Sequence, residues 1–272
     1  MTDTGSLRWL RLAGIAGIIG AILWTLGDAL IVGAKANGAD YPLLFQTYAS
    51  RIDVDLAAAT VPSSEARLAA GALVADVGIV FYLVGSWHLF RGLLPAGRKW
   101  AWPVFALLVC GNAWSPLGHA AFYYLGMAYK TVLVTPPAAH QALIELAARF
   151  HGVLLVAWLL PIVTLGLALI GLGVAIATGR TAWPRWFALV ANPVSLVLIG
   201  TAIPLVMPEP IKTALGGAAF NIGWLIIYLI STILLWNGGR TRERRGQGIP
   251  EIPFERPEPT AGYRRRLARS GG

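Results

Sequence analysis

Charged side chains are scarce in this sequence: only 13% of its 272 residues are Asp, Glu, Lys or Arg, whereas 56% are hydrophobic. A water-soluble chain needs enough polar residues to cover its core, and the apolar runs here leave too few. The mean hydropathy of +0.64 also lies far above that of a soluble domain. The composition therefore excludes an ordinary soluble protein and predicts an all-α integral membrane protein.

Cysteine and histidine are scarce as well. Cys110 is the single cysteine, so the chain cannot form an internal disulfide, and we expect this residue to serve packing. The four histidines show no His-x-x-x-His or His-x-x-Glu-His spacing, which in many metal sites fixes two ligands on one helix turn. No spacing motif therefore identifies a reaction or a metal.

Six apolar segments are each long enough to cross a bilayer core, which takes about 20 helical residues. They form one transmembrane domain over residues 11–237, with a long outer loop at 34–66. A short helix expected near 138–149 would extend the fourth segment outward. The expected spans are residues 11–33, 68–91, 101–128, 151–177, 185–206 and 216–237.

The distribution of Lys and Arg predicts the orientation of this bundle. Most basic residues fall in segments that are cytoplasmic if residues 1–10 are cytoplasmic, so both termini are expected inside the cell membrane. Residues 238–272 are rich in Arg and Pro, which predicts a disordered tail that lies against anionic lipid. Nothing resembles a nucleic-acid fold, and we expect no nucleic-acid partner. The chain has the general look of bacterial six-span proteins, a resemblance that implies no function.

Four ionisable residues lie inside the apolar segments, where a charge costs several kcal/mol unless it is compensated. They are Asp28, Asp76, His119 and His151. Counted from the span ends at about 1.5 Å per residue, all four fall in the outer half of the membrane. We therefore expect one candidate pocket, although each residue alone also fits a structural role between helices. His88 is expected as an interfacial anchor, and His140 in solvent.

Helical phase selects the other residues of the candidate pocket. Polar and aromatic residues recur on one stripe of the third segment and of the sixth, and a face of small residues beside Asp28 points into the bundle. The expected substrate-binding residues are Trp24, Asn112, Trp114, Ser115, Tyr123, Trp158, Asn221, Trp224 and Tyr228.

These residue types favour acid–base chemistry on a lipophilic, isoprenoid- or lipid-like molecule. A carboxyl group shielded from water favours its protonated form and can act as a general acid. Aromatic faces can stabilise a cation that develops on the substrate. We expect a cyclase or isomerase that needs no cofactor, with Asp28 or Asp76 as proton donor and His119 as base or orienting group.

Three alternatives use the same residues. Asp28, Asp76, His119 and His151 together are a plausible ligand set for a divalent metal, and the two histidines alone are a possible haem pair. The acids also suit a proton- or ion-coupled transporter. A multi-pass protein that is only a non-catalytic membrane partner fits the same pattern.

Overall fold

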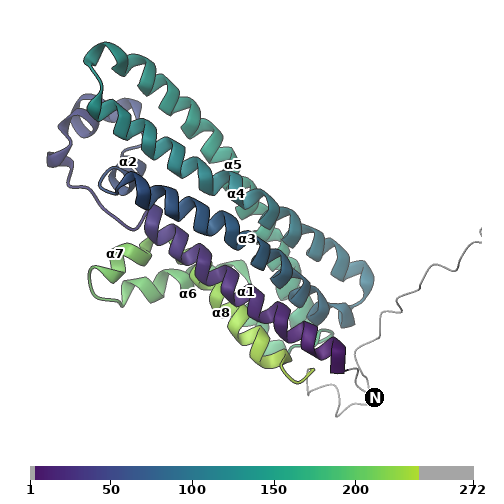
Figure 1. The fold of residues 1–272 in the computed structure, drawn as a ribbon. Helices are drawn as coiled ribbons and strands as arrows, with labels where there is room; N and C mark the ends of the chain where they lie inside the picture. Colours follow the sequence, from purple (N-terminus) through teal and green to yellow (C-terminus); the bar gives the residue numbers. More distant parts are fainter. Residues whose placement is uncertain (1–3, 239–272) are drawn as a thin grey trace, which may run out of the picture.

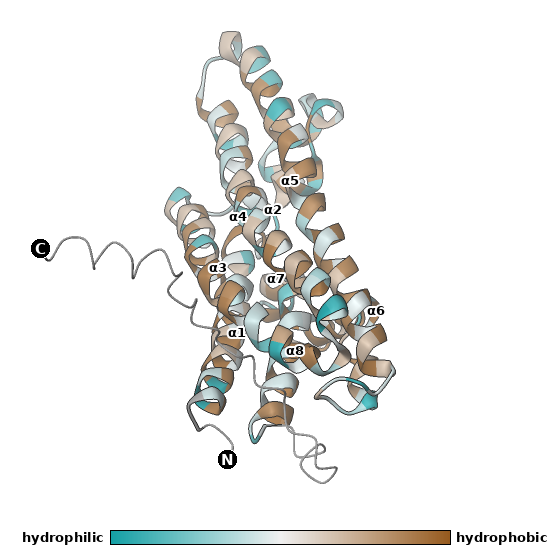
Figure 2. Cartoon of the chain, turned by 90° about the vertical axis from the view of Figure 1, so that its right-hand side faces the viewer, coloured by the Kyte–Doolittle hydropathy of each residue, from teal (hydrophilic) through white to brown (hydrophobic). Residues whose placement is uncertain are grey.

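The chain is all-helical over the part described by the computed structural model, residues 4–238, of which 84% are helical with no strand among them. Three helices are long and apolar enough to cross a membrane: Ser6–Ile31, Glu65–Ala96 and Pro137–Ala177. Hydrophobic residues run along the long helices (Figure 2). The chain therefore has the helices of a membrane protein. The predicted basic tail, beyond Gly238, lies outside the described residues.

A helix occupies each of the six apolar segments (Figure 1). The four long helices are α1 (Thr4–Ile31), α3 (Glu65–Leu93), α4 (Arg98–Val134) and α5 (Pro137–Ala177). Two further apolar helices are shorter, α6 (Pro193–Leu205) and α8 (Ala219–Leu235). Two short helices, α2 (Val54–Thr60) and α7 (Ile211–Gly216), lie in the connections at one end.

The fourth and fifth expected spans begin differently in the structure. Helix α5 begins at Pro137, so the short helix expected near 138–149 extends the fourth span outward as predicted. Helix α6 begins at Pro193 and not at residue 185, because residues 185–189 form a 3-10 turn. Asn192 then caps α6: its Oδ1 accepts the Ser195 N–H at 2.9 Å, and proline at the first helical position needs no hydrogen-bond acceptor.

The helices pack as a trough. Helices α1 and α3 form its floor; α4 and then α5 build one wall, and α8 and then α6 build the other. Along α3, Gly78 and Gly85 face α1, and a Cβ at Gly85 would lie 2.6 Å from the Gly17 Cα. Small residues allow this close approach of two helices. Helices α5 and α6 make few contacts with each other, so the two walls are only weakly packed against each other along their outer helices.

The N-terminal end of α1 is sealed by a buried polar cluster. His88 contacts the Leu10 carbonyl through Nδ1 at 3.0 Å and the Ser231 hydroxyl through Nε2 at 2.9 Å, and the Trp183 indole N–H donates to Ser231. Because a carbonyl only accepts, Nδ1 carries the proton and Nε2 accepts from Ser231. His88 is thus buried between α1, α3 and α8, which corrects the expectation of an interfacial anchor.

The opposite end is covered by residues 34–66, which fold into short helical turns and α2. Arg67 donates to the Leu30 and Ala29 carbonyls at 3.0 and 2.9 Å and so caps the C-terminus of α1. His140 is buried here, and its ring accepts from the Tyr48 hydroxyl and donates to the Thr135 carbonyl. The expectation that His140 is solvated was wrong: the folded loop covers it.

Candidate functional site

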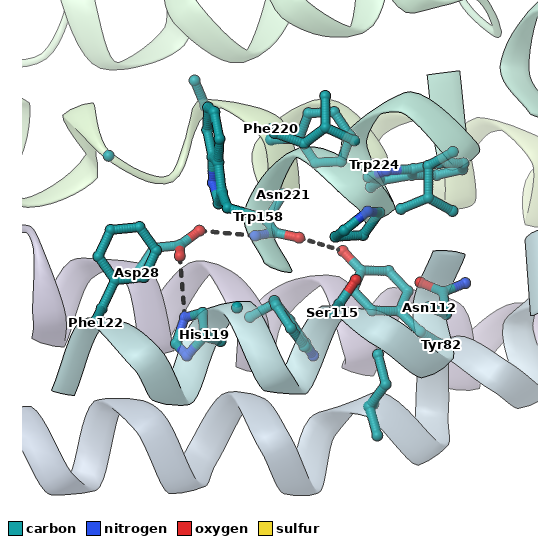
Figure 3. A pocket seen from close by; sticks show the side chains of 18 of the residues that line it. Asp28, Tyr82, Asn112, Ser115, His119, Phe122, Trp158, Phe220, Asn221 and Trp224 are labelled. Carbon is teal, nitrogen blue, oxygen red and sulfur yellow. Dashed lines mark hydrogen bonds and ion pairs between the residues drawn. The ribbon is translucent and has the colours of Figure 1, made fainter. Parts of the chain in front are cut away.

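An apolar cavity of about 470 Å³ lies inside the trough and is lined by residues of α1, α3, α4, α5, α6 and α8 (Figure 3). Its walls are rich in aromatic rings: Trp24, Phe122, Trp158, Phe220 and Trp224. A cavity of this size lies within the range of small-molecule sites, which are mostly apolar with a few placed polar groups.

A chain of hydrogen bonds crosses one side of the cavity and joins four helices (Figure 3). His119 Nε2 lies 3.1 Å from Asp28 Oδ1. The Asn221 amide donates to Asp28 Oδ2 at 2.7 Å, and the Tyr82 hydroxyl donates to Asn221 Oδ1 at 2.9 Å. These four residues come from α1, α4, α8 and α3, and we call them the polar chain.

The polar chain determines the orientation of its own members. Asp28 Oδ2 accepts, so the Asn221 NH₂ group must face it and Asn221 Oδ1 must face Tyr82. Both oxygens of Asp28 are then engaged, and the carboxyl group is held by two helices other than its own. A carboxyl group in direct contact with an imidazole is an arrangement that general acid–base catalysis uses.

The pair is shielded but not sealed. The side chain of His119 is 6% exposed and that of Asp28 is 16% exposed, and both line the cavity. The second ring nitrogen of His119, Nδ1, is buried without a hydrogen-bond partner among the described residues, as is the indole nitrogen of Trp24. The two rings meet edge to face, 4.9 Å between centroids. Buried nitrogens without partners are uncommon in proteins.

Eight of the thirteen residues predicted for the pocket line this cavity. They are Asp28 and His119 from the proposed catalytic set, and Trp24, Asn112, Ser115, Trp158, Asn221 and Trp224 from the proposed substrate-binding set. Five others do not line it: Asp76, His151, Trp114, Tyr123 and Tyr228.

Asp76 lies close to the cavity without lining it. It is near enough to His119 for an electrostatic interaction, but its Oδ1 is buried without a hydrogen-bond partner among the described residues. In contrast to Asp28, it has no side-chain hydrogen bond to another helix among residues 4–238. Asp28 is therefore the carboxyl group that the structure combines with His119.

His151 pairs with a different acid. Its Nε2 lies 3.2 Å from Asp53 Oδ2 in the outer loop, a charge contact without the geometry of a hydrogen bond. Because α5 starts at Pro137, His151 lies well inside the helix, where the folded loop reaches it. The Asp53 N–H also donates to the Tyr129 hydroxyl, and burial raises the Tyr129 pKa to about 12.

The four ionisable residues therefore do not form one ligand set. Asp28 and His119 line the cavity, whereas His151 lies with Asp53 beyond it. Within residues 4–238, no group of three or more His, Cys, Asp or Glu side chains is arranged to hold a metal ion.

The three remaining aromatic predictions fail to reach the cavity for separate reasons. Trp114 lies on another face of α4 and is 43% exposed. Tyr123 has the expected helical phase, but it packs against the cluster of Ile31, Leu68 and Ala72, and its neighbour Phe122 lines the cavity instead. Tyr228 is buried behind the lining, with its ring 5.8 Å from Trp224 and 5.9 Å from Tyr82.

Sequence reasoning missed Tyr82, Phe122 and Phe220. A signal for Tyr82 was present: it lies between Gly78 and Gly85, at the i+4 and i+3 spacings that mark one face of α3. Those glycines face α1, so Tyr82 is expected to point towards α1, the helix that carries Asp28. The two phenylalanines carried no signal, because apolar residues surround them in the sequence.

Comparison with known proteins adds a family without a function. Residues 1–237 match a family of unknown function (DUF6796), and because the match spans most of the sequence, the chain belongs to that family. No curated protein matches the chain. No solved structure matches it either.

Proposed function

We propose that this member of the DUF6796 family is a six-span membrane enzyme that acts on a lipophilic small molecule by acid–base chemistry. Six apolar helices in the predicted segments support the span count, with α6 and α8 as the shorter two. The excess of Lys and Arg in the expected inner segments supports cytoplasmic termini. This orientation places the cavity in the outer half of the bilayer.

The observation that carries the proposal is the contact between Asp28 and His119 at the wall of an apolar, aromatic cavity. Inside such a cavity water competes little for a proton, so an acid–base pair acts on whatever the cavity binds. In an isomerisation or cyclisation, the pair adds a proton to one carbon of a double bond. The cation that forms then loses a proton from another carbon, so the product is an isomer of the substrate.

The surrounding residues have roles that fit this reaction. Asn221 holds the Asp28 carboxyl group from the side opposite His119. The π faces of Trp24, Trp158 and Trp224 can stabilise positive charge on the substrate, an interaction worth about 0.5–2 kcal/mol for each ring.

The poor contact between α5 and α6 supports entry of the substrate from the bilayer. Trp158 on α5 and Val197 on α6 both line the cavity, and both are exposed, at 46% and 52%. Apolar side chains that face a cavity and its surroundings at once are expected at a mouth. A lipophilic molecule can pass there without crossing water.

A proton-coupled transporter is the second candidate. It is supported by Asp28, an acid in the bundle interior, and by a second cavity that adjoins the first at the outer end. Transport also requires a path to the inner face, where the cluster of His88, Ser231 and Trp183 is closely packed. The pairing of His151 with Asp53 leaves the metal and haem alternatives with less support.

Solvent deuterium distinguishes these functions. The purified protein is incubated in D₂O with a lipid extract of its host, and the products are analysed by mass spectrometry. We expect isomers that carry deuterium on carbon. Asp28→Asn and His119→Gln should lower the rate of labelling by about 10²–10⁴-fold, the usual contribution of general acid–base catalysis.

The matched control is His151→Gln, which changes the same residue type outside the cavity and should keep the labelling rate within about twofold. Labelling that is absent from the wild-type protein, or equal in all variants, contradicts the enzyme proposal. Uptake of unmodified molecules into proteoliposomes along a pH gradient would support the transporter instead.

A further inference from the structure

A second cavity, of about 460 Å³, adjoins the first at the end of the bundle where α2 and α7 lie (Figure 1). It is lined by residues after the end of α1, by α2 and by the segment from α6 to α7. The two cavities share two lining residues, Val32 and Gly217. They are therefore neighbours separated by one layer of side chains.

The step between the cavities along α1 is short. The Val32 N–H donates to the Asp28 carbonyl at 2.8 Å, which continues the helical pattern for one turn. One turn of α-helix rises about 5.4 Å. Asp28 consequently lies about one helical turn along the backbone from Val32, which lines both cavities.

The two cavities differ in chemical character. The first is bounded mainly by aromatic and aliphatic side chains, whereas the second has two cations, Lys35 and Lys212, and two anions, Asp55 and Glu209. All four charged residues are exposed. A charged cavity next to an apolar one matches an amphiphile, which has a polar head group and an apolar chain. Positive and negative side chains in the second cavity complement a head group that carries both a negative and a positive charge.

The junction is narrow at Gly217. A Cβ built there would overlap the Val32 side chain, whereas a Cβ at the neighbouring Gly216 would meet nothing within 4 Å. The absence of a side chain at Gly217 therefore keeps the layer between the cavities thin. A larger residue at this position would thicken that layer.

We propose that the ligand is an amphiphile with a zwitterionic head, whose head binds in the second cavity and whose chain binds in the first. This inference rests on the proposed function, because it names the class of substrate for the same site. It also places the reacting carbon within a few bonds of the head, since Asp28 lies only about one helical turn along the backbone from Val32 at the junction.

Three single-chain probes with the same oleoyl chain test the head specificity: lysophosphatidylcholine, which is zwitterionic, lysophosphatidylglycerol, which is anionic, and monooleoylglycerol, which is uncharged. Binding to the full-length protein in detergent is measured by native mass spectrometry. We expect the zwitterionic probe to bind at least about tenfold more tightly than the other two, equivalent to about 1.4 kcal/mol.

Two variants locate this preference. The double variant Lys35→Gln with Lys212→Gln should bring the zwitterionic and uncharged probes to within about twofold of each other. Lys99→Gln, an exposed charge at the far end of the bundle, should keep the tenfold difference. Gly217→Leu should also remove the preference, whereas Gly216→Ala should not.

The outcomes separate this inference from the proposed function. If the wild-type protein binds the three probes equally, or prefers the anionic one, the zwitterionic head is refuted while a lipophile site remains. If no probe binds saturably, both proposals fail. Deuterium found near the methyl end of the chain in the D₂O experiment would overturn the head-proximal reaction alone.

Discussion

Replacement of Asn221 by leucine tests whether the polar chain holds the bundle together. Asn221 on α8 donates to Asp28 on α1 and accepts from Tyr82 on α3, so it joins three helices. Leucine has a similar volume and no hydrogen-bonding group. The change therefore leaves the Asp28 carboxyl without one donor and the Tyr82 hydroxyl without its acceptor, while packing stays nearly the same.

Two estimates bracket the expected loss of stability. In soluble proteins a hydrogen bond to a charged group contributes about 1.5–3 kcal/mol and a neutral one about 1 kcal/mol, for a total of about 2.5–4 kcal/mol. Interhelical hydrogen bonds in a membrane protein average about 0.6 kcal/mol, for a total of about 1.2 kcal/mol. Tyr82 is buried and cannot exchange its partner for water, whereas Asp28 faces the cavity. We therefore expect an intermediate loss, about 2–3 kcal/mol.

Thermal unfolding in detergent, followed by the fluorescence of the 11 tryptophans, measures this loss. At about 2–4 °C for each kcal/mol in a chain of this size, Asn221→Leu should lower Tm by about 4–12 °C. Tyr82→Phe should cost about 1 kcal/mol in the wild-type protein. In the Asn221→Leu background it should cost almost nothing, because the hydroxyl group has already lost its acceptor.

Additivity would refute the reasoning. If the losses from Asn221→Leu and Tyr82→Phe sum to within about 0.5 kcal/mol in the double variant, the two side chains are not coupled. Tyr123→Phe is the matched control, because it removes the same hydroxyl group from a residue outside the cavity. Its effect should add to that of Asn221→Leu.

Two further predictions use matched pairs of variants. Trp158→Leu should weaken binding of a lipophilic ligand by about tenfold, whereas Trp114→Leu should leave binding unchanged. The two side chains are similarly exposed (46% and 43%), but only Trp158 lines the cavity. Equal effects of the two variants in native mass spectrometry would contradict the location of the site. Gly27→Ala should lower the free energy of unfolding by about 1–3 kcal/mol, since its Cβ would lie 2.8 Å from the Ala75 Cβ. Gly152→Ala should raise the free energy of unfolding by about 0.5–1 kcal/mol, because no atom lies within 4 Å of the added Cβ. Thermal unfolding checks this pair, and a stabilising Gly27→Ala would refute the close packing of α1 on α3.

The depth and helical face of a residue on its own helix were accessible without the structure. Asp28 and His119 were assigned to the same depth and to inward faces by counting residues from the span ends, and the structure brings their side chains to 3.1 Å. The same counting placed His151 at the start of the fourth span. Helix α5 extends outward from there to Pro137, as expected, and the fold of the outer loop gives His151 a different partner, Asp53.

Errors of partner and of face have a common origin. Tyr123 satisfied the helical period, yet its neighbour Phe122 lines the cavity, because the period does not say which of two adjacent faces the neighbouring helices leave open. His151 was grouped with the acids of other helices, although its partner is Asp53 in the outer loop. A loop has no period from which its fold can be predicted, so this pair was out of reach.

The sequence by itself determined the helical class, the apolar segments and the short set of polar residues that lie within them, because backbone hydrogen bonding and hydrophobic period are local properties. Only the tertiary structure decided which of those residues meet. Asn221 and Asp28 are 193 positions apart and Tyr82 and Asn221 are 139 apart, so their contacts depend on how α8 rotates and slides against α1 and α3. That choice is made by the packing of small residues and rings over the whole bundle, and the cavity beside the polar chain is its result.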